Sequence, residues 1–570
     1  MIFYKETNFK DTGIGKIPKE WEVVRLKDVA NIIMGQSPPS FTYNKEGRGL
    51  PFLQGKMEFG ESYPLPVMYC SNPSKVAETN DVLISVRAPV GDVNLALSKL
   101  CIGRGLAAIR FSHRVVNHLF YFYYLQKIKS LIEILGKGST FKAIVKDDLE
   151  NLIVPLPPLL EQQKIAEILS IFDEAIHKTN EIIAKTERLK KGLMQELLTK
   201  GVILGFMFDT NVFDEILDGK YDLPGNLRFY ATRIQLDEIR SIPDERRREE
   251  LLKTFNKVPT EIIPTEAIVV GISRVGMAKI SSSEDGELYK RMLNRLQELD
   301  EKDRKKKSIE NQARDILIGL TCIKNCFVLV TNDASLKDVM HEFKGHAITF
   351  EQFQKGEYRE FKDTEIGRIP KDWEVVRIGD ICEVIGGGTP STKVKEYWNG
   401  NIPFAIPTDV TELESRNVNF LNQTKGHITE KGLRESSTNL LPPGSILLTS
   451  RATIGSCVIS EVPVATNQGF ANIICGDTVH NLFILYLMKY MKKKLDQLAS
   501  GSTYKEISRV VVRNLRIPHP PLLEQQEIAE ILSIVDKKLE LERADKARLG
   551  KIKQGLMDLL LTGKIRVKVN

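Results

Sequence analysis

The sequence contains two long segments that are nearly identical, and this duplication constrains the fold more than any other feature. Residues 157–201 begin PPLLEQQKIAEILSIFDE, and residues 520–564 begin PPLLEQQEIAEILSIVDK. Apolar residues recur three and four positions apart in the first copy, which predicts one long amphipathic helix. Its apolar face consists of Ile165, Ile168, Phe172, Ile176, Ile183, Leu189, Leu193 and Leu197. Because such a helix is unstable alone, we expect the two copies to pack side by side as a coiled coil.

The duplication extends into the segments that precede these helices. FKDTGIGKIPKEWEVVRL, from Phe9, matches FKDTEIGRIPKDWEVVRI, from Phe361. SVRAPVG matches TSRATIG, and GSTFK matches GSTYK, whereas the stretches between these blocks diverge. If both copies contact one polymer in the same pose, shared residues would keep the fold and contact its uniform backbone. Divergent residues would then read two different sequences.

The globular part of each copy has short strand-like runs that are broken by Gly and Pro turns, which predicts a mixed α/β module. Arg87 and its counterpart Arg451 each end a strand-like run before a turn that contains Gly. Two interpretations stay open for these arginines. They contact a phosphate or a base, or they are surface side chains that bond a loop carbonyl.

Length and composition set the broad class of the protein. A chain of 570 residues is too long for one core, and we expect three or four domains. With 42% hydrophobic and 27% charged residues it has the composition of a soluble protein, and no apolar run reaches the roughly 18 residues of a membrane span. The first residues show no signal-peptide pattern, so we expect a cytoplasmic protein without a membrane partner. The net charge of +7 favours an anionic partner such as nucleic acid.

Several of these repeated features together resemble one family. They are the two-copy arrangement, the WEVVRL and WEVVRI segments, the Arg-x-x-x-Gly turn, the GST-aromatic-Lys segment and above all the repeated PPLLEQQ-x-IAEILS. In all of them the chain resembles the specificity (S) subunit of type I restriction-modification enzymes. The resemblance implies an α/β multidomain protein. Two target recognition domains each read one half of a split site on double-stranded DNA, and two antiparallel coiled-coil helices join them. We expect the DNA contacts to include Arg87, Arg104, Lys142, Arg451 and Lys505.

The same resemblance implies partner subunits. Two methyltransferase subunits, which carry S-adenosylmethionine, and ATP-driven restriction subunits would dock on this chain, largely through its helices. The recognition scaffold itself is then expected to hold no cofactor and no catalytic residue of methylation or restriction. The expected ranges are 1–156 and 356–519 for the recognition domains, 157–201 and 520–566 for the helices, and 202–355 for an inserted domain.

The insert departs from this family pattern. Strand-like and helix-like stretches alternate along it, which predicts a small parallel sheet with helices on both faces and ligands at the carboxyl ends of its strands. Asp209 and Asp333 directly follow strand-like runs, and Glu238 and Asp315 lie in predicted helices. Converging carboxylates suit Mg²⁺ or Mn²⁺, which can activate water for phosphodiester cleavage. Alternatively, Asp209 merely caps the helix that follows it.

Four motifs of the insert, FMFDTNVF, QLDEI, ARD-x-LIGLT and LVTND, resemble the PIN-domain nucleases in their order. This second resemblance implies an α/β/α PIN-like domain. Asp209, Glu238, Asp315 and Asp333 would be its catalytic and metal-binding residues, with Asp237 as the alternative to Glu238. The lysines of 305–307 lie in a run of mixed charge and are interpreted as a solvated surface.

The sequence therefore predicts a DNA-recognition subunit that carries an inserted candidate nuclease for RNA or DNA. A rival hypothesis is a metal-dependent PIN ribonuclease in which the repeats serve as a targeting or inhibitory scaffold. A third is that the insert is inert.

Overall fold

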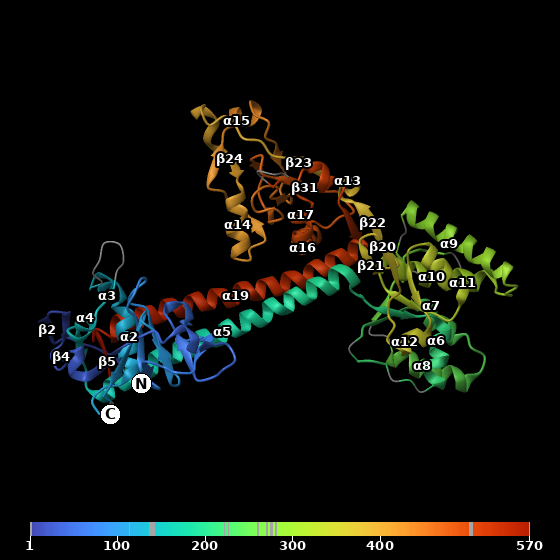
Figure 1. Ribbon diagram of the computed structural model, residues 1–570. Helices are drawn as coiled ribbons and strands as arrows, with labels where there is room; N and C mark the ends of the chain where they lie inside the picture. Colours follow the sequence, from blue (N-terminus) through green and yellow to red (C-terminus); the bar gives the residue numbers. More distant parts are fainter. Residues whose placement is uncertain are drawn as a thin grey trace. The chain divides into compact units, whose positions relative to one another are not determined.

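The computed structural model describes residues 3–568 except 113, 136–142, 220, 222, 226, 259–260, 270–271, 274–276, 280–281 and 501–504. The chain forms two compact units, which we call unit 1 (Met1–Ala184 with Leu541–Asn570) and unit 2 (Lys185–Glu540). Their boundaries fall inside the two long helices, α5 (Leu159–Lys200) and α19 (Leu522–Leu560), which are prominent in Figure 1. No helix among the described residues is long and apolar enough to cross a membrane.

The globular part of unit 1 is built around one antiparallel sheet and one mixed sheet. The first consists of β11 (Val93–Leu95), β10 (Val82–Ser85), β13 (Leu106–Phe111) and β5 (Ala30–Met34), in that order. The second consists of β6 (Tyr43–Asn44), β8 (Met68–Cys70), β7 (Leu50–Leu53), β12 (Leu100–Ile102) and β9 (Val76–Ala77). Within the second sheet β7 and β12 run parallel, so both strands end at the same edge.

Unit 2 contains a second module with related sheets. One consists of β23 (Cys382–Gly386), β31 (Ala471–Cys475), β28 (Ile446–Leu448), β29 (Cys457–Ser460) and β25 (Phe420–Leu421). The other consists of β26 (Gly426–Ile428), β24 (Trp398–Ala405), β30 (Val464–Thr466) and β27 (Leu440–Leu441). The strands β24 and β30 are parallel, as β7 and β12 are in unit 1. The mixed α/β modules predicted from the duplication are thus confirmed.

The long helices run antiparallel within each unit. In unit 1, Ile165 and Leu169 from the start of α5 share a core with Met557 and Leu560 from the end of α19. In unit 2 the arrangement is reversed, and the start of α19 shares a core with Leu197 and Leu198 from the end of α5. Because each helix contributes its opposite ends to different cores, it is stabilised by tertiary packing that it could not obtain alone.

One residue of the predicted apolar face is placed differently. Leu189 is 57% exposed, whereas Thr186 is buried and the neighbouring Lys190 forms an ion pair with Asp536 of α19 within unit 2. In this part of α5, a polar contact takes the place of the apolar helix–helix contact that the spacing of apolar residues predicts. The spacing within α5 could not show this, because Asp536, the partner of Lys190, lies far away in the sequence.

The start of each long helix is fixed by a buried carboxylate of the PPLLEQQ motif. Glu161 accepts hydrogen bonds from Trp21 Nε1 (3.0 Å) and from Arg566 Nε (2.7 Å) in unit 1. In unit 2, Glu524 accepts them from Trp373 Nε1 (2.8 Å) and from Arg359 Nη1 (2.6 Å). Arg566 belongs to the C-terminal strand β33 (Ile565–Val567), whereas Arg359 follows the insert. The repeated motif therefore anchors each module to its helix through a charge from elsewhere in the chain.

The insert belongs to unit 2 and has a parallel sheet of its own. Its strands are ordered β17 (Glu261–Ile263), β16 (Phe229–Thr232), β15 (Phe206–Phe208), β18 (Val328–Val330) and β19 (His346–Ile348). All neighbouring strands in this sheet are parallel. The first strand of the insert, β15, is central: β16 and β17 are added on one side of it, and β18 and β19 are added on the other side, so the order in which strands are added reverses at β15. A reversal of this kind leaves a crevice at the carboxyl ends of the two central strands.

Helices cover both faces of this sheet, as Figure 1 shows. On one face, Phe206 and Phe208 pack with α6 (Thr210–Asp218), α8 (Glu245–Lys257) and α12 (Phe350–Gln354). On the other face, Met207 packs with α9 (Ser283–Lys302), α10 (Ile309–Asn325) and α11 (Ala334–Glu342). The alternation of side chains along a strand explains why its consecutive residues enter two different cores.

Candidate functional site

The first candidate site is a hollow of about 530 Å³ at the loop ends of unit 1. Its lining includes Arg87 and Arg104, together with Gln54 and Met57. Met57 is 98% exposed. Gly105 allows the loops to approach closely, because a Cβ at this position would lie 2.6 Å from the carbonyl oxygen of Gln54. Two of the predicted DNA contacts, Arg87 and Arg104, thus meet in one place.

Backbone hydrogen bonds hold the loops around this hollow. In unit 1 they run from Gly103 N to Leu53 O (2.7 Å), from Val86 N to Gly105 O (2.9 Å) and from Ile144 N to Val86 O (2.9 Å). The same pattern recurs in unit 2, from Asn467 N to Ala405 O (3.2 Å), from Ser450 N to Gly469 O (2.7 Å) and from Ile507 N to Ser450 O (3.0 Å). The two modules therefore share one loop framework, in which Arg87 and Arg451 occupy equivalent positions.

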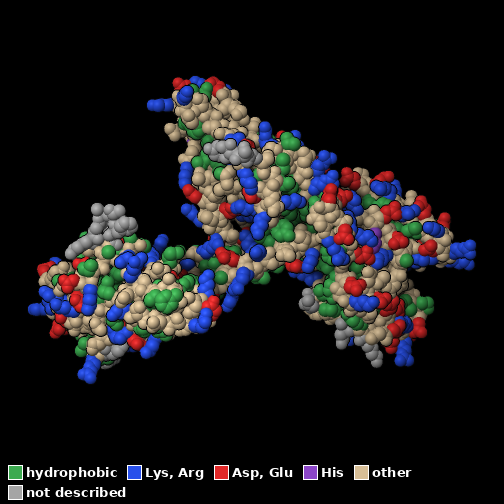
Figure 2. Space-filling model, viewed as in Figure 1, with side chains coloured by type: hydrophobic (Ala, Val, Ile, Leu, Met, Phe, Trp, Pro, Cys, Tyr) green, Lys and Arg blue, Asp and Glu red, His purple; other side chains and the backbone are tan. Residues whose placement is uncertain are grey.

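The side chains on this framework are engaged differently in the two units. Arg451 Nε lies 3.0 Å from Glu506 Oε2, and Lys505 Nζ lies 3.0 Å from Asp496 Oδ2. Ala143 occupies the position of Glu506 in unit 1, and within the described part of the chain Arg87 has no acidic partner. Lys142 lies outside the described residues. In Figure 2, basic and acidic side chains are interspersed over the visible face.

The second candidate site lies in the insert, where the carboxyl ends of β15 and β18 adjoin. Asp209 directly follows β15 and is buried; its Oδ1 accepts a hydrogen bond from the N–H of Thr210 (2.7 Å) and its Oδ2 from Thr331 Oγ1 (2.8 Å). It is also the N-cap of α6, so the interpretation as a helix cap holds as well. Burial raises the pKa of Asp209 above its ordinary value.

Glu238, on α7 (Arg233–Arg240), faces this crevice from the side. Its Oε2 accepts a hydrogen bond from Thr210 Oγ1, and Arg314 lies 3.9 Å from its other oxygen. Burial, and then the negative charge of Asp209, raises the pKa of Glu238. Asp237 forms an ion pair with Arg233 along the same helix (3.3 Å). Of the two candidates for the second acid, the structure thus brings Glu238 toward Asp209.

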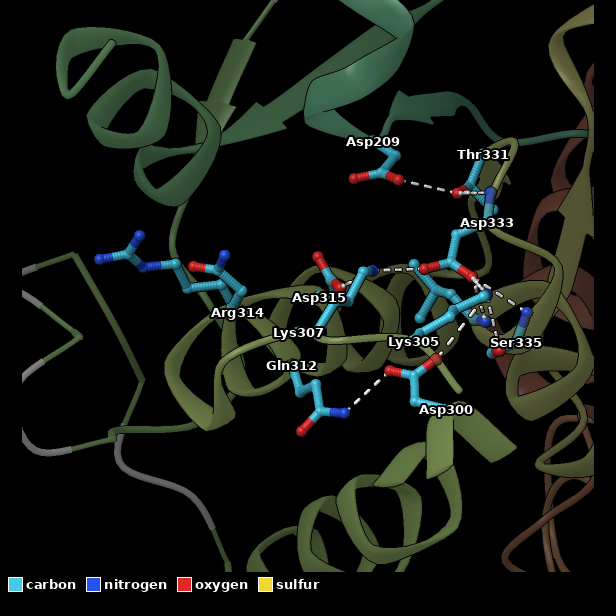
Figure 3. Close-up of polar contacts among 12 residues, drawn as sticks. Asp209, Asp300, Lys305, Lys307, Gln312, Arg314, Asp315, Thr331, Asp333 and Ser335 are labelled. Atoms are coloured by element: carbon cyan, nitrogen blue, oxygen red, sulfur yellow. Dashed lines mark hydrogen bonds and ion pairs between the residues drawn. The ribbon is translucent and has the colours of Figure 1, made fainter. Parts of the chain in front are cut away.

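Asp315 and Asp333 complete the set, and both are bonded to the same lysine (Figure 3). Lys307 Nζ lies 2.7 Å from Asp315 Oδ2 and also donates to Asp333 Oδ2. Burial, and then the charge of Asp209, raises the pKa of Asp315 to about 8. Burial would also raise the pKa of Asp333, but hydrogen bonds from Lys305 and Lys307 outweigh it, so this pKa is lowered.

These lysines correct a sequence prediction. The run 305–307 was expected to be a solvated surface, yet the side chains of Lys305 and Lys307 are only 32% and 27% exposed and point into the acidic cluster. Lys306 between them is exposed. The charge pattern of the sequence does not predict these contacts. They form because the loop that carries the lysines lies next to the buried carboxylates in the folded chain, and the sequence does not show that the two are neighbours. The three consecutive lysines give no sequence signal that separates Lys306 from its two neighbours.

The chemistry of the cluster suits a hard divalent cation, because its donors are carboxylate oxygens. The arrangement of the cluster does not suit such a cation, because among the described residues no group of three or more His, Cys, Asp or Glu side chains is placed to hold one metal ion. Lys307 lies between the two carboxylates that would have to converge. Assignment of Mg²⁺ or Mn²⁺ to Asp209, Glu238, Asp315 and Asp333 stays a prediction.

Comparison with known proteins places the duplication in a family. The profile described as type I restriction modification DNA specificity domain matches residues 18–188 and 370–551, and the range 202–355 lies between these two matches. In Methanocaldococcus jannaschii, the putative type I restriction enzyme MjaX specificity subunit is 54% identical over 198 residues, which are 34% of this chain and 47% of that protein. The MjaIX specificity subunit is 45% identical over 195 residues, which are 34% of this chain and 44% of that protein. This chain is therefore matched to slightly less than half the length of each of these relatives.

Longer matches are more distant. The type I restriction enzyme MjaVIII specificity subunit of the same organism is 23% identical over 582 residues, covering 100% of this chain and 98% of that protein. Among solved structures, the S subunit of a type I restriction-modification system from M. genitalium covers 97% of this chain and 97% of its own, with 13% identity and a TM-score of 0.45.

Proposed function

Because this chain belongs to the type I restriction-modification DNA specificity family, we propose that it reads a bipartite site on double-stranded DNA, with one half-site for the module of each unit. It would direct two methyltransferase subunits and the restriction subunits to that site. S-adenosylmethionine and ATP would be bound by those partners, and we assign no cofactor to the recognition modules. The matched relatives are named as specificity subunits, which supports this assignment.

The observation that carries the proposal is that the two modules present different side chains on one loop framework. Arg87 and Arg451 are the shared pair. Three neighbouring positions differ between unit 1 and unit 2, namely Gln54 and Ile406, Arg104 and Gln468, and Ala143 and Glu506. A DNA backbone is the same at both half-sites, whereas the base edges differ. Shared arginines on a common framework suit phosphates, and the divergent neighbours suit bases.

The chemistry of the divergent residues supports this division. Guanidinium groups pair with the two acceptors of guanine in the major groove, amides pair with adenine, and carboxylates accept from the amino group of cytosine. Arg104, Gln468 and Glu506 are of these three types and are side chains at the loop ends. We therefore propose these positions, with Gln54, as the ones that set the sequence of each half-site.

An exchange between the modules tests the assignment. In the complex of the full chain with its methyltransferase subunits, methylated sites are mapped by sequencing for the wild type and for the double variant Gln54→Ile, Arg104→Gln. We expect a changed first half-site and an unchanged second half-site. Arg87→Ala is the matched control, because loss of a phosphate contact should weaken binding to all sequences alike and lower the salt slope by about 1. A change in both half-sites would refute the model of two independent readers.

We propose a second, separate function for residues 202–355, as a PIN-like nuclease acting on RNA or DNA with Mg²⁺ or Mn²⁺. Its support is the set of contacts at the carboxyl ends of β15 and β18, where Asp209 and Glu238 both accept hydrogen bonds from Thr210, and Asp315 and Asp333 both bond Lys307. The test is Mn²⁺-dependent cleavage of single-stranded RNA and DNA by the full chain, beside Asp209→Asn. Cleavage that this variant loses would support the nuclease, and cleavage without any methylation partner would favour a ribonuclease scaffold. The insert is an inert module if neither the folded wild-type chain nor a folded Lys307→Met variant, which lacks the lysine bonded to Asp315 and Asp333, cuts either substrate.

A further inference from the structure

The loop between α9 and α10 brings two ammonium groups into the acidic cluster of the insert (Figure 3). Lys307 Nζ bonds Asp315 Oδ2 (2.7 Å) and Asp333 Oδ2. Lys305 Nζ lies 2.7 Å from the other oxygen of Asp333 and 2.8 Å from Ser335 Oγ. Both oxygens of Asp333 are therefore taken by cations that belong to the chain itself.

The loop is held in this position by its own contacts. Asp300, which is 1% exposed, accepts a hydrogen bond from Gln312 Nε2 (2.8 Å), and its backbone carbonyl accepts one from the N–H of Lys305 (2.8 Å). Arg304 adopts a φ of 55°, which turns the chain back toward the cluster. Ser308 then caps α10 by accepting from the N–H of Asn311 (3.2 Å). The two lysines are thus set by a built turn and not by free rotation of surface side chains.

A divalent cation would need the same oxygens. Mg²⁺ binds carboxylate oxygens at about 2.0–2.1 Å. An ion that bridged Asp315 and Asp333 would therefore lie next to the ammonium of Lys307. The two neighbouring positive charges would repel each other strongly, because a half-buried site screens them little. The lysine and the metal ion are alternatives for one position.

We propose that Lys307, supported by Lys305, is the built-in cation of this cluster, and that a divalent cation binds there only when the ammonium of Lys307 has been withdrawn or removed. The insert is in this way held closed to metal ions by its own chain. The inference concerns which cation occupies the cluster, and it holds whether or not the insert cleaves nucleic acid.

The test is a titration of the full chain with Mn²⁺, in which free Mn²⁺ is followed by its electron paramagnetic resonance signal. Lys307→Met should add one binding site, with a Kd for Mn²⁺ at least about tenfold lower than any binding by the wild type that depends on Asp315. Lys306→Met is the matched control, because this exposed lysine of the same loop should leave the titration unchanged. Adding Asp315→Asn to Lys307→Met should abolish the new site.

Two results would overturn the proposal. One is a wild-type chain that already has a site dependent on Asp315 with the Kd of the variant. The other is a folded Lys307→Met chain that gains no site. Thermal unfolding provides the check on folding: Lys307→Met should unfold at a lower temperature than the wild type, and Mn²⁺ should raise that temperature. If Lys307→Met does not fold, Lys307→Gln, which keeps a hydrogen-bond donor without the charge, replaces it in both measurements.

Discussion

At the scale of single residues, buried and half-buried carboxylates are paired with cations from distant parts of the sequence. The pairs are Glu161 with Arg566, Glu524 with Arg359, Asp173 with Lys553, Asp536 with Lys190, and Asp333 with Lys307. A buried charge without such a partner is costly, so each pair constrains the fold around it. Tyr123 and Tyr486 donate to Asp173 and Asp536 (2.6 and 2.7 Å), which makes the two units alike in this detail as well.

His346 shows the opposite situation, a half-buried base whose buried Nε2 has no hydrogen-bond partner among the described residues. Burial lowers the pKa of His346 from 6.5 to about 4. As the pH falls below 6.5, the unfolded chain therefore binds a proton at this position before the folded chain does. The contribution of neutral His346 to stability is complete above pH 6.5 and is lost progressively toward pH 4, by about 3 kcal/mol at most.

We predict that His346→Gln flattens the loss of thermal stability between pH 7 and pH 5. The measurement is the unfolding temperature of the full chain at several pH values, for the variant beside the wild type. His177→Gln is the control, because this exposed histidine of α5 should leave the pH dependence as it is in the wild type. Equal slopes for His346→Gln and the wild type would show that His346 does not govern this pH range.

At the scale of elements, the long helices depend on the carboxylate at their first turn. Glu524 joins α19 to Trp373, to Arg359 and to the N–H of Val202 (2.8 Å) at the end of α5. One side chain thus ties together the beginning of one long helix, the end of the other and the module of unit 2.

We predict that Glu524→Gln lowers the unfolding temperature of the full chain, because it leaves the buried Arg359 with Asp372 as its remaining ionic partner. Breaking a buried ion pair costs on the order of 3–5 kcal/mol. Glu196→Gln, which removes an exposed ion pair with Lys200 on α5, is the control and should cost less than about 1 kcal/mol. Equal unfolding temperatures for the two variants in calorimetry would contradict the anchoring role of Glu524.

At the scale of the whole molecule, the insert is joined to unit 2 at the position where α5 ends. Val202, the first residue of the insert, and Arg359, which follows it, both contact Glu524, so the residues that anchor α19 lie just outside the inserted sheet. The family match also ends before the insert and resumes after it. A domain connected in this way can be removed if both anchors are kept.

We predict that replacing residues 204–355 by a flexible Gly-Ser linker leaves the methylated DNA motif of the complex unchanged. Residues 202 and 359 are kept because their contacts with Glu524 hold unit 2 together. The motif is mapped by sequencing of methylated DNA, and the same deletion with Arg359→Ala should lower the unfolding temperature. A shifted motif in the deletion that keeps Arg359 would show that the insert takes part in DNA recognition.

The sequence by itself determined the elements that depend on local pattern. A period of three to four residues is a property of one segment, and it placed α5 and α19; the duplication then predicted two related modules and the family. Alternating strands and helices likewise predicted a parallel sheet for the insert, and acids at strand ends predicted that Asp209 and Asp333 would adjoin.

Only the tertiary structure decided which distant side chains meet. The cations at Glu161 and Glu524, the exposed position of Leu189 and the inward turn of Lys305 and Lys307 all depend on segments far apart in the chain. A buried charge without a partner costs free energy, so the folded chain pairs buried carboxylates with cations. Which carboxylates are buried depends on how the whole molecule packs. For this reason the acids of the insert could be named from the sequence, whereas the lysines that neutralise them could not.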